Sequence, residues 1–139
     1  MLSVTADLDL VLVLGGERTV AVPASLMYAA SNPYAVTTVF RTSDGDVTWV
    51  FGRDLLEDGL REAVGEGDVV VWPSPDGVDD VVYLSLASPS GSALLEADAA
   101  ALRLFLDQAY LVVPRGCESD HLDMDAEIAD LLGDTPTTR

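Results

Sequence analysis

The chain has 139 residues, 49% of them hydrophobic, and its formal net charge at pH 7 is −17 because 24 acidic residues face only 7 arginines and no lysine. This length suits one domain with a buried core, and the apolar fraction argues against intrinsic disorder. The charge disfavours binding to nucleic acid or anionic lipid, which bind clustered Lys and Arg, so we expect protein partners with basic or apolar patches, or an acidity that serves only solubility.

Alternating apolar residues predict a hairpin at the start of the chain. The even positions from Val4 to Leu14 are all apolar, which is typical of a half-buried strand. Gly15-Gly16 predicts a turn into a second strand over Arg18 to Val22. Pro23 is expected to end that strand, since proline cannot donate to a sheet ladder.

A second hairpin is predicted after the turn at Asn32-Pro33. The turn at Ser43 to Asp46 leads into a strand over Val47 to Phe51. The strand before that turn is predicted from its alternating residues Tyr34, Val36, Thr38 and Phe40.

A short helix and a third hairpin follow. Asp54 is predicted to cap the helix, with Glu57 three residues on and Gly59 as its C-terminal stop. The segments Gly67 to Trp72 and Val78 to Ala87 are rich in β-branched residues and predict two strands joined by a loop of turn formers.

One more strand and two helices are predicted in the last third. A turn at Ser88 to Gly91 precedes a strand over Ala93 to Ala97, and Asp98 is expected to cap a helix that Pro114 closes. Apolar residues recur in that helix at helical spacing: Leu102, Phe105, Leu106, Ala109, Tyr110 and Val113.

A short amphipathic helix is predicted over Asp123 to Leu132, followed by a flexible tail at residues 133–139. No linker or internal repeat divides the chain. The sequence therefore predicts a single domain over residues 1–139 of class α+β, with a bent, barrel-like antiparallel sheet of six or seven strands and two or three helices.

The acidic stretch around the single histidine, His121, does not make a calcium loop. Acids recur at Asp123, Asp125 and Glu127, but the sixth position of such a loop requires glycine and is Ile128 here. The twelfth position carries Asp134 in place of a bidentate glutamate. We expect an exposed acidic helix start that complements the helix dipole, and no metal.

Catalytic groups are also scarce. Cys117 and His121 are close in sequence, but the acids around them should raise the thiol pKa, so an inert cysteine is favoured over a nucleophile. Gly65-Glu66-Gly67 leads into a strand and not into a helix, so it predicts a turn and not a dinucleotide site. The absence of lysine removes Walker and Schiff-base chemistry. We expect no enzyme activity and no cofactor.

Aromatic residues on the predicted strands allow two interpretations. They could stack single-stranded nucleic acid or pack in the core. The core is favoured because only Arg41 and Arg53 lie near them. The aromatic residues concerned are Tyr34, Phe40, Trp49, Phe51 and Trp72.

The compartment follows from what the sequence lacks. Asp7 and Asp9 interrupt the only early apolar stretch, so no signal peptide is predicted. The longest apolar runs, such as Val11 to Leu14, are far shorter than the roughly 20 residues of a membrane span. A single cysteine excludes an internal disulfide. We expect a cytoplasmic protein without a membrane span.

Several blocks, in order along nearly the whole chain, resemble the SsgA-like family of sporulation and cell-division proteins from filamentous bacteria. Asn32 stands where the family usually shows Asp, and Gly52 where Ala is usual. The blocks are Asn32 to Val36, Trp49 to Leu56 with Gly59, Gly67 to Val69 with Val71 to Pro73, Leu86 to Ala97, and Phe105 to Pro114.

The resemblance implies a non-enzymatic adaptor that acts at division sites and controls septum placement by recruiting or stabilising the tubulin-like GTPase FtsZ or an FtsZ-recruiting partner. The alternative is a regulator of peptidoglycan-remodelling proteins. The family also implies a homo-oligomer, a trimer, with a fold similar to Whirly-type single-strand binders, although the charge opposes nucleic-acid binding here. The partner-binding residues stay unassigned; Arg53 and Asp54 could form an ion pair, a cap or a subunit contact.

Overall fold

The computed structural model describes residues 2–65, 67–75 and 80–119, and within them it contains seven strands and two helices. This confirms the predicted α+β class. The predicted helix over Asp123 to Leu132 and the tail at 133–139 lie outside the described residues. The elements are β1 (Ser3–Gly15), β2 (Arg18–Ala29), β3 (Ala35–Thr42), β4 (Gly45–Gly52), α1 (Arg53–Gly59), β5 (Val69–Pro73), β6 (Val81–Ser88), β7 (Gly91–Asp98) and α2 (Ala99–Val112).

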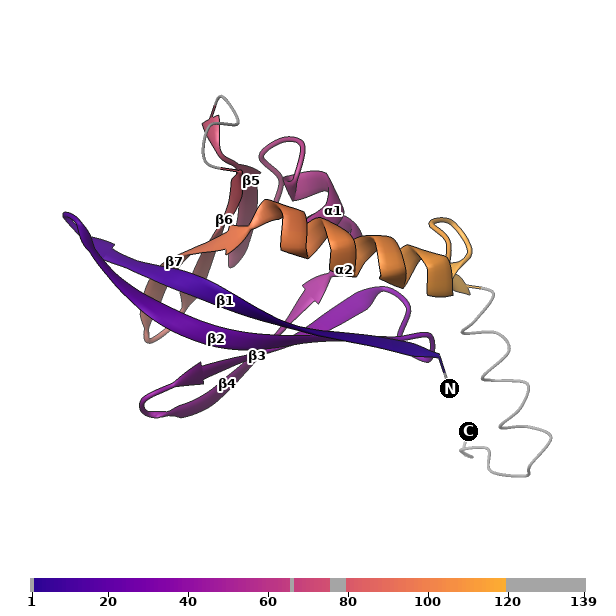
Figure 1. The fold of residues 1–139 in the computed structure, drawn as a ribbon, viewed down its shortest axis with the longest axis horizontal. Helices are drawn as coiled ribbons and strands as arrows, with labels where there is room; N and C mark the ends of the chain where they lie inside the picture. The colour runs from indigo at the N-terminus through magenta and orange to yellow at the C-terminus, as the bar shows by residue number, and fades with distance from the viewer. Residues whose placement is uncertain (1, 66, 76–79, 120–139) are drawn as a thin grey trace.

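All seven strands belong to one sheet, in the order β4-β3-β2-β1-β7-β6-β5, and every neighbouring pair is antiparallel. The sheet curls into a half-barrel (Figure 1). The β1–β2 hairpin is its longest pair and runs from Ser3 opposite Ala29 to Gly15 opposite Arg18. Both helices pack on the inner side of the curl, where they contact strands from both halves of the sheet.

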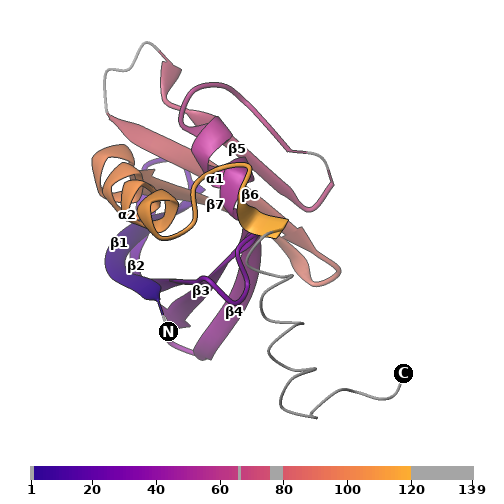
Figure 2. The ribbon, with the colours of Figure 1, turned by 90° about the vertical axis from the view of Figure 1, so that its right-hand side faces the viewer.

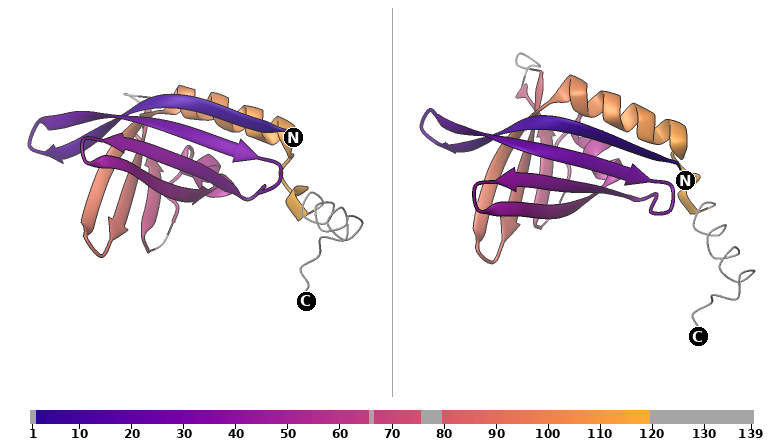
Figure 3. Two further views of the ribbon diagram at one scale, coloured as in Figure 1. Left: turned by 90° about the horizontal axis from the view of Figure 1, so that it is seen from below. Right: turned by 60° about the horizontal axis from the view of Figure 1, so that its bottom comes forward.

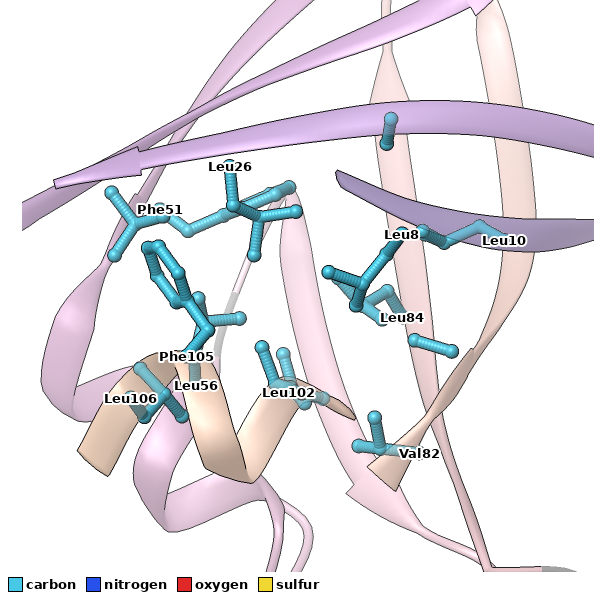
Figure 4. Packing of buried hydrophobic residues seen from close by; sticks show 14 of the residues in the cluster. Leu8, Leu10, Leu26, Phe51, Leu56, Val82, Leu84, Leu102, Phe105 and Leu106 are labelled. Carbon is cyan, nitrogen blue, oxygen red and sulfur yellow. The ribbon is translucent and has the colours of Figure 1, made fainter. Parts of the chain in front are cut away.

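Strand alternation builds the core that the sequence predicts. Leu8 and Leu10 of β1 point inward together with Leu84 of β6, and the apolar side of α2 closes the space between the two halves (Figure 4). Full burial of one such side chain contributes about 1.5–3 kcal/mol. The apolar helix residues that this core buries are Leu56, Leu102, Phe105, Leu106, Ala109 and Val113.

The predicted end of the second strand at Pro23 is wrong, because β2 continues for six residues to Ala29. Pro23 lies opposite Asp9 of β1, whereas the ladder between β2 and β3 begins only at Ala24. The missing N–H is tolerated because β2 has no ladder partner on its β3 side at this residue.

The start of α1 also differs from the prediction. The N-cap position is Gly52, without a side-chain cap, and Asp54 lies inside the first turn. Gly59 is the last helical residue and Leu60 the C-cap, so Gly59 is not a left-handed stop. Its small size is required instead, because an added Cβ would lie 2.6 Å from the Cβ of Val71 on β5.

The remaining strands follow the predicted pattern with shifted ends. Tyr34 belongs to the turn before β3, and β5 begins at Val69 and not at Gly67. The capping prediction for α2 is confirmed, since the Asp98 carboxylate accepts a 3.0 Å hydrogen bond from the backbone N–H of Ala100. No helix in the described part of the chain is long and apolar enough to cross a membrane.

Candidate functional site

The groups weighed for catalysis are not brought together by the part of the chain that the structure describes. Cys117 is half-buried in the segment after α2, and His121, with the acidic stretch from Asp123 to Asp134, lies outside the described residues. Among the described residues no three His, Cys, Asp or Glu side chains are arranged to hold a metal ion. Gly65 and Gly67 have positive φ angles of 112° and 77°, as the predicted turn requires.

The most unusual side chain is Arg53, which is only 1% exposed although it begins α1. Its Nη1 atom donates hydrogen bonds to the Tyr28 hydroxyl at 2.8 Å and to the carbonyl oxygens of Val113 at 2.6 Å and Ala109 at 3.2 Å. Its Nη2 atom forms an ion pair with Glu118 at 2.9 Å. The charge is therefore compensated inside the protein, as a buried arginine requires.

Two tyrosines complete this Arg53 cluster, which we define as Arg53, Tyr28, Tyr110 and Glu118. The guanidinium carbon lies 4.0 Å from the ring centre of Tyr110 and 5.0 Å from that of Tyr28, within the range of cation–π attraction. Burial raises the pKa of both hydroxyls, so both remain neutral donors: Tyr28 donates to the Pro33 carbonyl at 3.0 Å and Tyr110 to Asp54 at 2.7 Å.

The Arg53 cluster ties the segment after α2 to the fold. Hydrogen bonds from its own backbone amide, from Arg53 and from the Gly116 amide at 2.9 Å hold the pKa of the Glu118 carboxyl below its ordinary value. The guanidinium of Arg53 in α1 thus contacts residues of β2, α2 and the segment up to Glu118. Of the three predicted roles, Arg53 takes the ion pair, with Glu118 and not with Asp54.

The outer surfaces of α1 and α2 form a charged groove of about 360 Å³. Arg115 contacts Asp58 at 3.2 Å and Asp54 at 3.6 Å, and Arg61 pairs with Asp58 at 2.9 Å. The hydrogen bond that Arg115 donates to the Asp58 carboxylate raises the pKa of Arg115. These arginines are already paired within the chain, so the groove presents no concentrated positive charge to an anionic ligand.

The predicted core role of the aromatic residues is confirmed for two of the five. Phe40 and Phe51 are 4% and 3% exposed and meet edge to face. Trp49 and Trp72 are half-buried, Trp49 stacked on Phe51 and Trp72 on Tyr83. Tyr34 is 51% exposed. The aromatic rings form no continuous basic stacking face.

Exposed apolar side chains mark the surfaces that are suited to protein contacts. Leu104 and Leu111 of α2 are 62% and 83% exposed, and their separation of seven residues sets them on the same outward side of the helix. Val47 and Val50 on β4 are 45% and 58% exposed. The other large exposed apolar residues are Leu2, Leu14, Val20, Met27 and Tyr34.

The Arg53 cluster was only partly visible in the sequence. Arg53 stood out as a charge within an apolar block, but Tyr28 and Glu118 did not, since Glu118 is 65 residues from Arg53. No local spacing pattern connects such residues. Only the tertiary fold shows that they meet.

Comparison with known proteins gives consistent matches over nearly the whole chain. Residues 22–118 match the family model described as Streptomyces sporulation and cell division protein, SsgA. The sporulation-specific cell division protein SsgB of Frankia casuarinae is 46% identical over 96% of this chain and 94% of its own length. The SsgB protein of Streptomyces coelicolor is 45% identical over 96% of this chain and 98% of its own.

Two solved structures match the fold as well as the sequence. The structure of an SsgA-like sporulation-specific cell division protein from Thermobifida fusca superposes with a TM-score of 0.85 at 41% identity, over 94% of this chain and 96% of that one. An SsgB structure reported with longitudinal cell division during sporulation of Streptomyces coelicolor has a TM-score of 0.82 at 46% identity, over 86% and 95% of the two chains.

Proposed function

The chain belongs to the SsgA family of sporulation and cell division proteins, and from that premise we propose that it acts in sporulation-specific cell division as a non-enzymatic adaptor. The observation that carries the proposal is the 45% identity to SsgB of Streptomyces coelicolor, which spans 96% of this chain and 98% of that protein. Identity of this extent is not confined to one motif, so it supports a shared role as well as a shared fold.

We propose that the adaptor works in the cytoplasm at division sites, where it controls septum placement by recruiting or stabilising FtsZ directly or through an FtsZ-recruiting partner. The distribution of groups in the described residues supports binding in preference to catalysis. The arginines of the α1–α2 groove, Arg61 and Arg115, are paired with acids, whereas several large apolar side chains remain exposed.

A homo-oligomer, specifically a trimer, is part of the proposal. Exposed apolar residues on α2, β1 and β2 offer surface that self-association would cover.

The test is co-sedimentation of the purified chain with FtsZ from the same organism in the presence of GTP. Saturable co-pelleting with longer or more stable filaments than in the control without this chain is the expected result. If the chain stays in the supernatant at all concentrations, the direct FtsZ role is refuted.

Regulation of peptidoglycan-remodelling proteins remains the second candidate function. Pull-down from sporulating cells distinguishes the two candidates. Recovery of wall-remodelling proteins without division proteins would favour this alternative.

A further inference from the structure

The two edge strands of the sheet, β4 and β5, differ in the hydrogen bonds that their backbones make outside the sheet. At the β5 edge, Val64 exchanges two backbone hydrogen bonds of 2.9 Å with Val71, and the strand ends in Pro73. At the β4 edge, no described residue outside the ladder with β3 hydrogen-bonds to the backbone from Asp46 to Phe51. Within the described residues, the β5 edge is therefore partly covered and the β4 edge is open.

The open edge has few of the features that usually protect an edge strand, and its one charged residue is Asp46 near the hairpin. Lysine, proline and bulges prevent edge strands from pairing with other chains, and β4 contains no lysine or proline. Its residues from Val47 to Phe51 are uncharged and have high strand propensity. Val47 and Val50 are 45% and 58% exposed and lie on opposite faces of the strand.

A hollow for side chains lies beside this edge on the inner face. It measures about 270 Å³ and is lined by Trp49 of β4 and by the β6–β7 hairpin, with Leu86 and Ala93 as its apolar residues and Ser88, Ser90 and Ser92 as its polar ones. The helix α1 contacts both β4 and β5 and lies where β4 ends. The strands β4 and β5 are the two edges of the curled sheet, which Figures 2 and 3 show from three further sides.

The charges around the β4 edge favour one kind of binding partner over others. Asp44 and Asp46 lie at the β3–β4 hairpin, and Arg41, opposite Asp46 on β3, donates a 2.7 Å hydrogen bond to Ser25. A second copy of the chain would bring another net charge of −17 to an acidic edge. A segment with basic side chains is electrostatically complementary.

We propose that β4 is a strand-addition site that takes an extended segment of a partner protein with alternating apolar and basic side chains. The segment would pair with the open backbone of β4 from Asp46 to Phe51 and insert an apolar side chain into the hollow beside Trp49. Backbone hydrogen bonds supply affinity in this mode, and the pocket and the acids supply specificity. The inference rests on the proposed adaptor function for its partner, but the β4 site can be tested without FtsZ.

The first test titrates the isotope-labelled full chain with a capped nine-residue peptide that alternates valine with arginine and threonine. The peptide is N-methylated at every valine so that only one of its edges can pair. The expected result is that amide signals of Asp46 to Phe51 shift and become protected from exchange, more weakly at high salt. A peptide N-methylated at every residue has no backbone N–H donors and should not bind. Absence of changes on β4 at millimolar peptide would overturn the inference.

The second test uses variants with matched chemistry. V47K/V50K adds edge charges that oppose pairing, and L104K/L111K adds the same charge at two leucines on α2 that are more exposed. Peptide affinity should fall by about tenfold or more in the β4 variant and stay within about twofold of wild type in the α2 variant. Equal affinities would refute the β4 site.

Co-sedimentation of the same proteins with FtsZ separates the inference from the proposed function. If V47K/V50K no longer pellets with FtsZ but L104K/L111K still does, both the β4 site and the proposed function are supported. Unchanged pelleting of both variants would support FtsZ binding and overturn β4 as its site. If wild type does not pellet but the peptide still binds β4, the direct FtsZ role fails and the strand-addition site remains supported.

Discussion

At the scale of single residues, the ion pair between Arg53 and Glu118 is the most consequential contact in the described residues. Both side chains are almost fully buried, at 1% and 7% exposed. Removing one partner of a buried pair leaves the other charge uncompensated, which typically costs 3–5 kcal/mol. Arg53 would keep Tyr28 and two carbonyl acceptors, so we expect a smaller cost of about 2–3 kcal/mol in the unfolding free energy of E118Q at pH 7.

The same pair predicts a pH dependence with a definite sign. The pKa of Glu118 is lowered in the folded state, so its contribution is fully present above the unfolded value near 4.5 and is lost as the pH falls through the folded value. Urea unfolding of wild type and E118Q at a series of pH values should give curves that differ at pH 7 and converge in acid. Asp58, which is half-buried and pairs with Arg61 and Arg115 at the surface, provides the control, since D58N should cost less than about 1 kcal/mol. If the difference in unfolding free energy between wild type and E118Q stayed constant down to pH 2, this pH dependence could not come from Glu118.

At Thr38 we expect the opposite result, because its buried hydroxyl destabilises the folded protein. The side chain is 2% exposed, its Oγ1 atom has no hydrogen-bond partner among the described residues, and it lines an apolar cavity of about 20 Å³ in the core. An unsatisfied buried hydroxyl costs about 1–3 kcal/mol, and valine has nearly the same shape. T38V should therefore leave the unfolding free energy unchanged or raise it by about 1 kcal/mol, as measured by urea denaturation. A loss of stability would show that the hydroxyl is bonded in solution.

At the scale of elements, the contact between α1 and β5 depends on a glycine. Helix propensity alone predicts that G59A stabilises α1 by about 1 kcal/mol. The added methyl would lie 2.6 Å from the Val71 Cβ, and overpacking of this kind costs about 1–3 kcal/mol. We expect the packing term to exceed the propensity term, so the melting temperature of G59A should fall.

The control for G59A is the glycine at the other end of the helix. At Gly52 an added Cβ would be 3.5 Å from the Leu55 Cβ, an ordinary contact, and the backbone is extended. G52A should therefore keep or slightly raise the melting temperature, because alanine restricts the unfolded chain. A G59A protein as stable as G52A would mean that α1 can move away from β5 at little cost.

Local patterns predicted the elements well because alternation and helical spacing are local properties. The even positions of β1 from Val4 to Leu12 and the apolar stripe of α2 face the core as expected, whereas Leu14 is exposed. The features that these patterns missed depend on residues from other elements that lie close in space. Pro23 is allowed inside β2 only because the β3 ladder starts one residue later, and Gly59 is required by Val71, which belongs to another element. The open β4 edge likewise depends on strand order, which alternation does not specify.

At the scale of the whole molecule, the distribution of charge governs binding. The net charge is −17, and four of the seven arginines, Arg53, Arg61, Arg103 and Arg115, pair with acids around α1 and α2. Nucleic-acid binding requires a concentrated basic surface, which these paired side chains do not provide. The absence of single-stranded nucleic-acid binding at physiological salt stays a prediction, and a salt-sensitive micromolar affinity for an oligonucleotide would contradict it.

The same charge makes the proposed self-assembly dependent on salt. Every copy that joins an oligomer carries a formal charge of −17, so repulsion grows with each subunit. The Debye length falls from about 30 Å at 0.01 M ionic strength to about 8 Å at 0.15 M, which screens most of that repulsion while the attraction between apolar surfaces remains. Light scattering at a fixed protein concentration should therefore give three times the chain mass of 14.7 kDa at 0.15 M salt and a lower mass at 0.01 M. Choline chloride at equal ionic strength should act like sodium chloride, since screening does not depend on the identity of the cation. A single-chain mass at both salt concentrations would refute self-assembly, and a trimer that weakens as salt is added would show that ion pairs between subunits dominate the interface.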